Sequence, residues 1–404
     1  MNGRAPEMPV GGEVEAGFEA VREAFAANLS RGQTLGSACT IYHRGKRVVH
    51  LWGGWQDKAR TDPWREDTVV LVYSVTKGLS ALCCAHAVSR GLFSYDEPIT
   101  AIWPEFAGGG KGDLTVGQVL SEQAGVAALD IKLNRANMAD QDAMARAIAR
   151  QSPNWPPGAL AGNHSYTLGW LACEVIRRRD PKHRSLGHYF AEEVAGPIGA
   201  DSWIGLPASV DRSRIAHIKG FSFVDLFLHH TDMPWELVFA LMWPFSLSFR
   251  TLNNPFLLSG PAALDAEKWR TIELGACGGI ASAAALASIY QSLAVAPEAQ
   301  LGTKVLAELS AGMQAPSRGL FDDVLKINLR YSHGFEKPFD GWEFARTRSA
   351  FGTFAVGGSF AFADPDDEVA YAWVTNELGT HKWDDPREKS VRDTFYSCLP
   401  RRPS

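Results

Sequence analysis

The sequence has 404 residues, 46% of them hydrophobic and 21% charged, which suits one large or two interlocked folded domains and excludes a disordered chain. The formal net charge is −5, from 40 Lys and Arg against 45 Asp and Glu, and no long run of one sign is present. This balance offers no basic surface for a phosphate backbone, so a nucleic acid is not an expected partner.

The N-terminal part of the chain predicts a helix, a hairpin and a second, longer helix. Apolar residues at helical spacing predict an amphipathic helix over Glu13–Leu29. β-Branched and aromatic residues in Ser37–Tyr42 and Val48–Trp52 predict two strands joined through Gly45. Helical periodicity over Ser74–Arg90, followed by a glycine, predicts a long buried helix.

From about Asp96 to Leu309 the pattern is mostly helical, with proline and glycine turns. Strand signal returns at Thr353–Phe362 and Val369–Thr375, and an amphipathic helix fits Arg387–Cys398. Strands at both ends around a helical middle predict an α+β fold with an antiparallel sheet built from the two termini. We expect residues 1–95 and 325–404 to form the sheet domain, 96–324 an inserted helical domain, and a cleft to lie between them.

Ser74 and Lys77 form the strongest local chemical signal, the SxxK tetrad Ser74-Val75-Thr76-Lys77. Residues three apart share a helix face, so the Lys77 amine can reach the Ser74 hydroxyl. A desolvated lysine can then act as the base for a serine nucleophile, and the helix N-terminus favours the developing alkoxide. On the tetrad alone, a capping serine with a solvent-facing lysine is the simpler interpretation.

Several further segments, in order along nearly the whole chain, make the sequence resemble the class C β-lactamase-like serine hydrolases, and within them the family VIII carboxylesterases. The segments that carry the resemblance are Val69–Leu79, Gly91-Leu92, Tyr95–Ile99, Trp103–Phe106, Leu120–Gly125, Trp155–Gly158, Gly169-Trp170 with Glu174, Gly358-Ser359 and Phe362–Pro365. The resemblance implies an acyl-serine mechanism in which Ser74 attacks a carbonyl, Lys77 is the base and a tyrosine passes the proton to the leaving group.

The position of that tyrosine holds Asn163, which has no titratable proton near neutral pH but whose amide can orient Lys77, a water or a carbonyl. Tyr166, three residues on, is an alternative phenol, although a core aromatic is the simpler interpretation. His164 is an alternative acid or base, because an imidazole titrates in the right range.

A late-strand position that is basic or aromatic in this superfamily holds Thr353. The backbone N–H at about Val356 and that of Ser74 remain available for an oxyanion hole, since backbone donors do not depend on side chains. Without the cation, hydrolysis of β-lactams, which carry a carboxylate, is disfavoured. Glu122 stands where the resemblance leads us to expect a histidine, and we interpret it as structural.

Residues 221–258 are rich in Phe, Trp, Leu and Met. A packed helical core is one interpretation. The alternative is that part of this segment, including Phe239 and Trp243, lines a pocket for an acyl or aromatic substrate. The charge-free stretch Leu237–Phe249 contains Pro244 and is shorter than the roughly 20 residues of a membrane span.

Other chemistries find no support in the sequence. The six cysteines have no CxxC spacing and predict buried thiols in a reducing, cytoplasmic compartment, and Met1–Glu19 has no secretory-signal pattern. His229, His230 and Asp232 lack a further ligand cluster, so no metal is predicted, and Gly108–Gly112 is not a phosphate loop. No cofactor is expected.

Two functions stay open. The first is a serine hydrolase or acyltransferase that acts on a small hydrophobic ester, thioester or amide through acyl-Ser74. The second is a binding or scaffold protein that kept the fold and lost turnover, which Asn163 and Thr353 favour. Ser74 beside a buried Lys77 favours the enzyme, because desolvating an amine is costly unless it is used.

Overall fold

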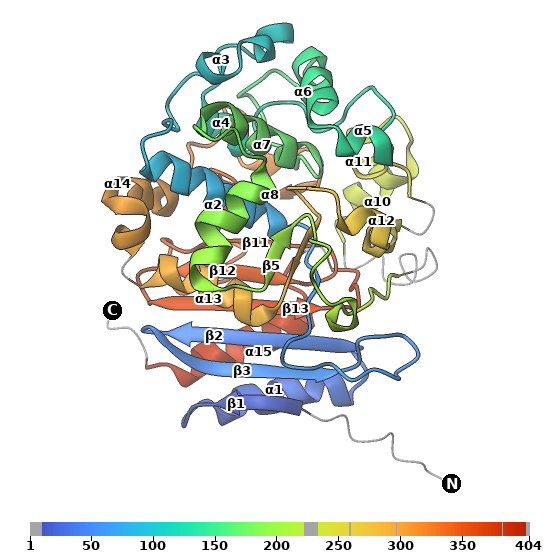
Figure 1. Cartoon of the computed structure of the whole chain (residues 1–404), viewed down its shortest axis with the longest axis vertical. Coiled ribbons are helices and arrows are strands. Elements are labelled where there is room, and N and C mark those ends of the chain that lie inside the picture. The colour runs from blue at the N-terminus through green and yellow to red at the C-terminus, as the bar shows by residue number, and fades with distance from the viewer. Residues whose placement is uncertain (1–9, 222–232, 258–259, 296, 382, 401–404) are drawn as a thin grey trace.

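A computed structural model describes residues 10–221, 233–257, 260–295, 297–381 and 383–400. Its main sheet has eight strands in the order β1-β3-β2-β13-β12-β11-β10-β9, and the N-terminal β2 pairs antiparallel with the C-terminal β13 (Figure 1). The predicted α+β fold, with a sheet built from both termini, is confirmed. The strands of this sheet are β1 Val10–Val14, β2 Gly36–His43, β3 Lys46–Gly54, β9 Arg330–Ser332, β10 Phe335–Lys337, β11 Phe351–Phe354, β12 Phe360–Asp364 and β13 Val369–Thr375.

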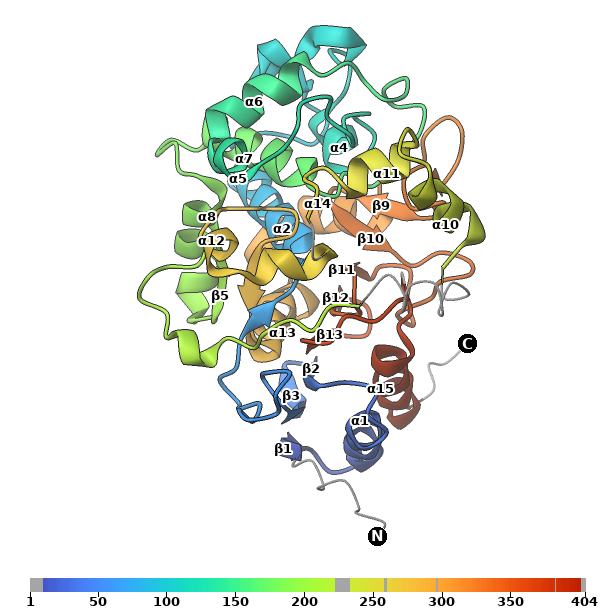
Figure 2. The ribbon, with the colours of Figure 1, turned by 90° about the vertical axis from the view of Figure 1, so that its right-hand side faces the viewer.

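Helices cover both faces of the sheet (Figure 2). Helices α1 and α15 pack together on one face, while α13 lies against β2, β12 and β13 on the other. The main helices are α1 Glu19–Ser30, α2 Val75–Ser89, α3 Ile99–Ile102, α4 Val116–Leu120, α5 Arg135–Ala139, α6 Gln141–Arg150, α7 Thr167–Arg179, α8 Leu186–Tyr189, α10 Trp235–Met242, α11 Leu247–Leu252, α12 Glu267–Arg270, α13 Ala283–Ala294, α14 Pro297–Ala311 and α15 Pro386–Cys398. Helix α13 therefore packs on the sheet although it belongs to the interval 96–324.

Two predicted boundaries were wrong. The helix predicted from Glu13 begins only at Glu19, because Val10–Val14 pairs with β3 as an edge strand and backbone pairing outweighs the helical periodicity. The strand predicted over Thr353–Phe362 is broken into β11 and β12 by a turn. Gly357 (φ 89°) and Gly358 (φ 103°) make that turn in a region of backbone space that favours glycine.

The predicted hairpin, the long buried helix, the strand Val369–Thr375 and the C-terminal helix are confirmed. Strands β2 and β3 meet at Arg44 (φ 52°) and Gly45 (φ 76°), the two positive φ angles of a tight hairpin turn. Helix α2 ends before Gly91, which has φ 72°, and α15 ends at Cys398, as predicted.

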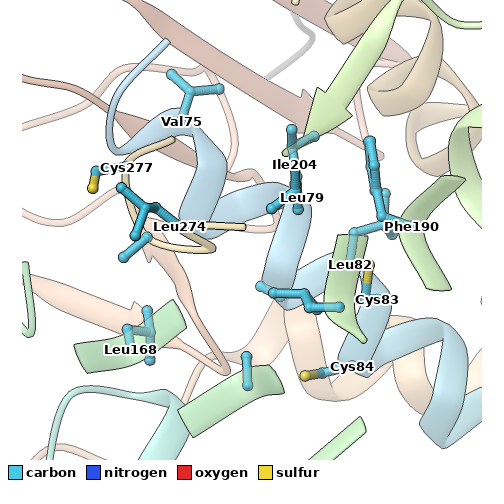
Figure 3. Packing of buried hydrophobic residues seen from close by; sticks show 14 of the residues in the cluster. Val75, Leu79, Leu82, Cys83, Cys84, Leu168, Phe190, Ile204, Leu274 and Cys277 are labelled. Carbon is cyan, nitrogen blue, oxygen red and sulfur yellow. The ribbon is translucent and has the colours of Figure 1, made fainter. Parts of the chain in front are cut away.

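Helix α2 is the central element of the larger hydrophobic core (Figure 3). Apart from His86, Val88 and Ser89, all its residues are buried, and side chains such as Leu168 of α7 and Leu274 surround it. Two short sheets complete the fold: β4 Val70–Leu71, β6 Gly279–Ala281 and β5 Ser202–Ile204 form one, and β7 Phe321–Asp322 with β8 Ile327–Asn328 forms the other. Because α2 is buried on all sides, the residues at its N-terminus are held in fixed positions.

All six cysteines are unpaired thiols, and five of them are buried, as predicted. Among the described residues, no helix has the length and apolarity that a membrane crossing needs. The same part of the chain contains no cluster of His, Cys, Asp and Glu suited to a metal ion. Phe227, His229, His230 and Asp232 lie outside the described residues.

Candidate active site

Ser74 lies at the turn between β4 and α2. The residue before it, Tyr73, has φ 45°, an unfavourable conformation for a bulky side chain. Two bonds to β6 hold the turn: Val72 N–H donates to Gly279 O (2.9 Å), and Gly279 N–H donates to Thr76 Oγ1 (2.8 Å). The neighbouring strand thus maintains a strained backbone that presents Ser74.

The structure contradicts the interpretation of Ser74 as a capping serine with a solvent-facing lysine. The Ser74 side chain makes no capping hydrogen bond and is half-buried. The Lys77 side chain is 1% exposed. A hydroxyl free of a structural bond and a buried amine therefore lie within one turn of the same helix.

Lys77 is paired with Glu122, to which the sequence assigned no role. Lys77 Nζ donates to Glu122 Oε1 at 2.7 Å, and both side chains are at most 2% exposed. No hydrogen bond joins Lys77 Nζ to Ser74 Oγ in this state. Burial alone would raise the pKa of Glu122, but Lys77 and His164 outweigh it and lower that pKa to about 2.

His164 is placed where it supports Glu122. Its backbone N–H donates to Glu122 Oε2 (2.7 Å), and its Nδ1 lies 2.8 Å from the same oxygen and 2.7 Å from Gly162 O. Its Nε2 accepts the N–H of Val126 (3.1 Å), so the single ring proton is on Nδ1. With both ring nitrogens engaged and no exposed surface, this imidazole is poorly placed to act as the alternative acid or base.

Asn163 and Tyr166 flank this histidine. Asn163 is 7% exposed, and its Oδ1 accepts a hydrogen bond from the Ser165 hydroxyl at 2.7 Å. Tyr166 is half-buried against the larger hydrophobic core, and burial of its phenol raises its pKa. The structure thus leaves Tyr166 as a packed aromatic and puts no phenol in hydrogen-bond contact with Lys77.

Glu336 of β10 is a second buried carboxyl near Lys77. It is 2% exposed, and its Oε2 has no hydrogen-bond partner in the described chain. Burial raises its pKa to about 8, although the nearby Lys77 charge acts in the opposite direction and the Glu122 charge adds to the rise. Two buried carboxyls whose pKa values are shifted in opposite directions therefore lie near the same lysine side chain.

Thr353 lies against helix α2 with no exposed surface. A Cβ on Gly78 would come within 2.6 Å of Thr353 Oγ1 and 2.2 Å of the Tyr290 hydroxyl. Glycine at position 78 therefore allows β11 and α13 to approach the helix directly beside Lys77. Thr353, an uncharged residue, therefore occupies the position where the family resemblance leads us to expect a basic or aromatic side chain.

Val356 lies in the turn between β11 and β12. This turn is closed by Ala355 N–H to Ser359 O (2.8 Å) and is tied to α15 by Arg387 Nη2, which donates to Gly357 O (2.7 Å). Within the described chain, neither the Val356 N–H nor the Ser74 N–H donates a hydrogen bond. Both backbone donors are therefore unpaired, which is a necessary condition for the predicted oxyanion hole.

The residues expected to line a substrate pocket, Phe239 and Trp243, are 64% and 62% exposed. The packed-core interpretation of this segment is therefore wrong for α10, where only Leu237 is buried. Asn254, which follows α11, donates to Leu129 O and Ile131 O in the chain that continues from Glu122. This contact links the exposed segment to the loop that leads away from the active-site carboxylate.

Glu122 and Glu336, which lie near Lys77, were not predicted as members of the site. Glu122 carried a usable signal, since it stands in place of an expected histidine within one of the matching segments. Glu336 carried none, because Phe335-Glu336-Lys337 has the pattern of any edge strand with charged residues. Only the packing of β10 beside β11 brings it near α2.

Comparison with known proteins gives consistent results. The sequence matches the beta-lactamase family over residues 21–394. It is 31% identical over 378 residues to the Esterase/beta-lactamase LipL of Mycobacterium tuberculosis, covering 91% of this chain and 83% of that protein.

Two solved structures are similar over nearly the full length. A family VIII carboxylesterase superposes with a TM-score of 0.84 at 32% identity, covering 97% of this chain and all (100%) of the other. A penicillin-binding protein homologue from Caulobacter crescentus gives a TM-score of 0.83 at 31% identity, with coverage of 97% and 100%.

Proposed function

This chain belongs to the beta-lactamase family, and from that premise we propose that it is a serine carboxylesterase acting through an acyl-Ser74 intermediate. The proposal rests on two side chains that share one helix face. The Ser74 hydroxyl makes no capping hydrogen bond, and the Lys77 side chain is 1% exposed. Both relatives named for esterase activity, LipL and the family VIII carboxylesterase, match over most of the chain.

In the proposed reaction, Ser74 Oγ attacks the carbonyl carbon of an ester while Lys77 takes its proton. The N–H groups of Ser74 and Val356 bind the oxyanion, and the proton on Lys77 passes to the leaving alkoxide. Water then releases the acid by the same steps. Each step uses groups of this chain and water, and we expect no cofactor.

The substrate class that we propose is a small hydrophobic ester or thioester. The exposed aromatic side chains of α10, including Phe239 and Trp243, offer an apolar surface for an acyl or aryl group. Thr353 contributes no positive charge, so a substrate carboxylate finds no partner there and β-lactams are poor substrates. Asn163 in place of a phenol slows attack by water and favours transfer to an added alcohol or amine.

A catalytically inactive binding protein is the second candidate, and the Lys77–Glu122 pair favours it. In this state the amine donates to Glu122 at 2.7 Å, not to Ser74. Such a protein binds its ligand without turnover, in the cleft that we expect between the sheet and the helical region. We propose a cytoplasmic location for either function, because all six cysteines are unpaired thiols.

The experiment that separates these functions is intact-mass analysis after incubation with a fluorophosphonate and with p-nitrophenyl esters. We expect an adduct on the wild-type protein and none on Ser74→Ala. The rate at which an acyl adduct is lost to water, compared with added alcohols and amines, separates a hydrolase from a transferase. A folded wild-type protein that no reagent labels is the outcome that supports the binding protein.

A further inference from the structure

The surroundings of Lys77 show which group controls its charge. Glu122 Oε1 is 2.7 Å from Lys77 Nζ, in a space where neither side chain is more than 2% exposed. The other oxygen of the same carboxylate accepts the backbone N–H of His164 at 2.7 Å. A carboxylate that accepts hydrogen bonds on both oxygens is favoured in its ionised form, and it stabilises an adjacent ammonium group.

The backbone at Glu122 is strained in a way that directs this carboxylate. Glu122 has φ 64°, in the left-handed region that non-glycine residues seldom adopt. Bonds on both sides hold it: Gly162 N–H donates to Glu122 O (3.1 Å), and Gln123 N–H donates to Gln118 O (3.1 Å). A strained residue whose side chain meets the proposed base is a feature of a functional site.

We propose that Glu122 is a positioning residue that holds Lys77 as an ammonium ion, so that Ser74 becomes nucleophilic only after Lys77 releases a proton to solvent. This inference rests on the proposed acyl-serine function and adds its pH dependence. The enzyme is then activated by alkaline pH, and the charge of Glu122 sets where the activation occurs.

The chemical step balances without another reactant. Once Lys77 has lost one proton, its Nζ lone pair accepts the proton of Ser74 Oγ–H as the Oγ–C bond forms, and the carbonyl π electrons move to oxygen. When the tetrahedral intermediate collapses, the ester C–O bond breaks and the proton on Nζ moves to the leaving alkoxide. Deacylation repeats the sequence with water in place of Ser74.

Other ionisable groups also lie close to the pair, on the elements around it. These groups are His164 before α7, Glu336 on β10, Cys277 before β6, Asp322 on β7 and Tyr331 on β9. Glu336 has a pKa of about 8, so its ionisation in the alkaline range adds a second negative charge near Lys77 and broadens the activation.

The test is the rate of fluorophosphonate labelling of Ser74, and kcat/KM for p-nitrophenyl acetate, between pH 5.5 and 10. For the wild type we expect both rates to rise with pH in the alkaline range. In Glu122→Gln, which removes the charge but retains a hydrogen-bonding oxygen, we expect the midpoint of the rise to move toward acid by about 1–3 pH units. KM should change less than about twofold, because the Glu122 side chain is only 2% exposed and is not available for contact with a substrate.

Glu122→His is the second variant, because histidine is the residue that the family resemblance predicts at this position and it carries no negative charge. It should show the same acidic shift as Glu122→Gln. Equal midpoints in wild type and variants, with lower rates, overturn the inference and leave Glu122 a structural residue. A wild-type labelling rate that is flat from pH 6 to 9 overturns it without any variant. Complete absence of labelling in the wild type instead refutes the acyl-serine function itself.

Discussion

Two regions of this protein depart from the usual burial of side chains in opposite directions. Around Lys77 the ionisable residues are inside: Lys77, Glu122 and Glu336 are each at most 2% exposed. On α10 the apolar residues are outside, with Trp235 66% and Met242 73% exposed. Charged residues are almost never fully buried unless paired, and clusters of large exposed apolar residues mark interaction surfaces.

The two regions differ in how much their side chains contribute to the free energy of unfolding. The Lys77 cluster is surrounded by the main core, so a change in its charges alters both chemistry and the free energy of unfolding. Helix α10 buries only Leu237, so its exposed side chains contribute little to folding. Function and stability should therefore be inseparable in the first region and separable in the second.

The largest expected effect is that of Lys77→Met. Removing the amine should lower kcat/KM about 10²–10⁴-fold through loss of the base. It also leaves Glu122 as a buried carboxylate without its partner, which should lower the free energy of unfolding by about 3–5 kcal/mol. Urea denaturation and esterase assays measure the two effects.

The matched control is the double variant Lys77→Met with Glu122→Gln. With the second charge also removed, most of the lost stability should return while activity stays absent. If the double variant is as unstable as Lys77→Met, the instability comes from packing around the lysine stem and not from an unpaired charge. That outcome would show that the charges around Lys77 do not determine the stability of this region.

The fold was largely predictable from the sequence, because the pairing of strands from both termini follows from where the strand and helix signals lie. The hairpin around Gly45 and the end of α2 at Gly91 depend on local turn chemistry, and both were predicted correctly. The errors at Glu13 and at residues 355–359 arose where long-range pairing and a glycine turn outweigh local pattern.

The candidate site was only half predictable. Ser74 and Lys77 are three residues apart, so a helix places them together and sequence spacing is sufficient. Glu122 and Glu336 reach Lys77 from a loop and from a strand far along the chain, and no local pattern encodes such a contact. The sequence also does not predict that Phe239 and Trp243 are exposed, since an apolar helix has the same pattern whether or not other elements cover it.

A smaller effect is expected from Glu336→Gln, and it depends on pH. The pKa of Glu336 is raised by burial from 4.5 to about 8, so between these pH values the folded state keeps a proton that the unfolded state has lost. This carboxyl therefore contributes stability that is complete below about pH 4.5 and is lost as the pH rises to about 8. The slope is at most about 1.4 kcal/mol per pH unit.

Glutamine imitates the protonated carboxyl, so Glu336→Gln should match the wild type near pH 5 and exceed it in stability above pH 8. Denaturant unfolding of both proteins at pH 5, 7 and 9 measures the difference. Asp364 and Glu388, whose pKa values are also raised, are present in both proteins and cancel in the comparison. A constant difference across this range would show that Glu336 does not titrate in the folded protein.

The smallest stability effect is expected on α10, where Phe239→Ala and Trp243→Ala should change the free energy of unfolding by no more than about 0.5 kcal/mol. If these rings receive the acyl chain, kcat/KM for p-nitrophenyl octanoate should fall about 10-fold relative to the acetate ester. Ile198→Ala is the matched control, because Ile198 is 45% exposed elsewhere on the surface and its replacement should alter neither quantity.

Unchanged chain-length preference in both α10 variants would show that this surface does not contact the substrate. An equal loss of kcat/KM on the octanoate and acetate esters would indicate that the substitutions act through the loop that Asn254 contacts, since that loop continues from Glu122.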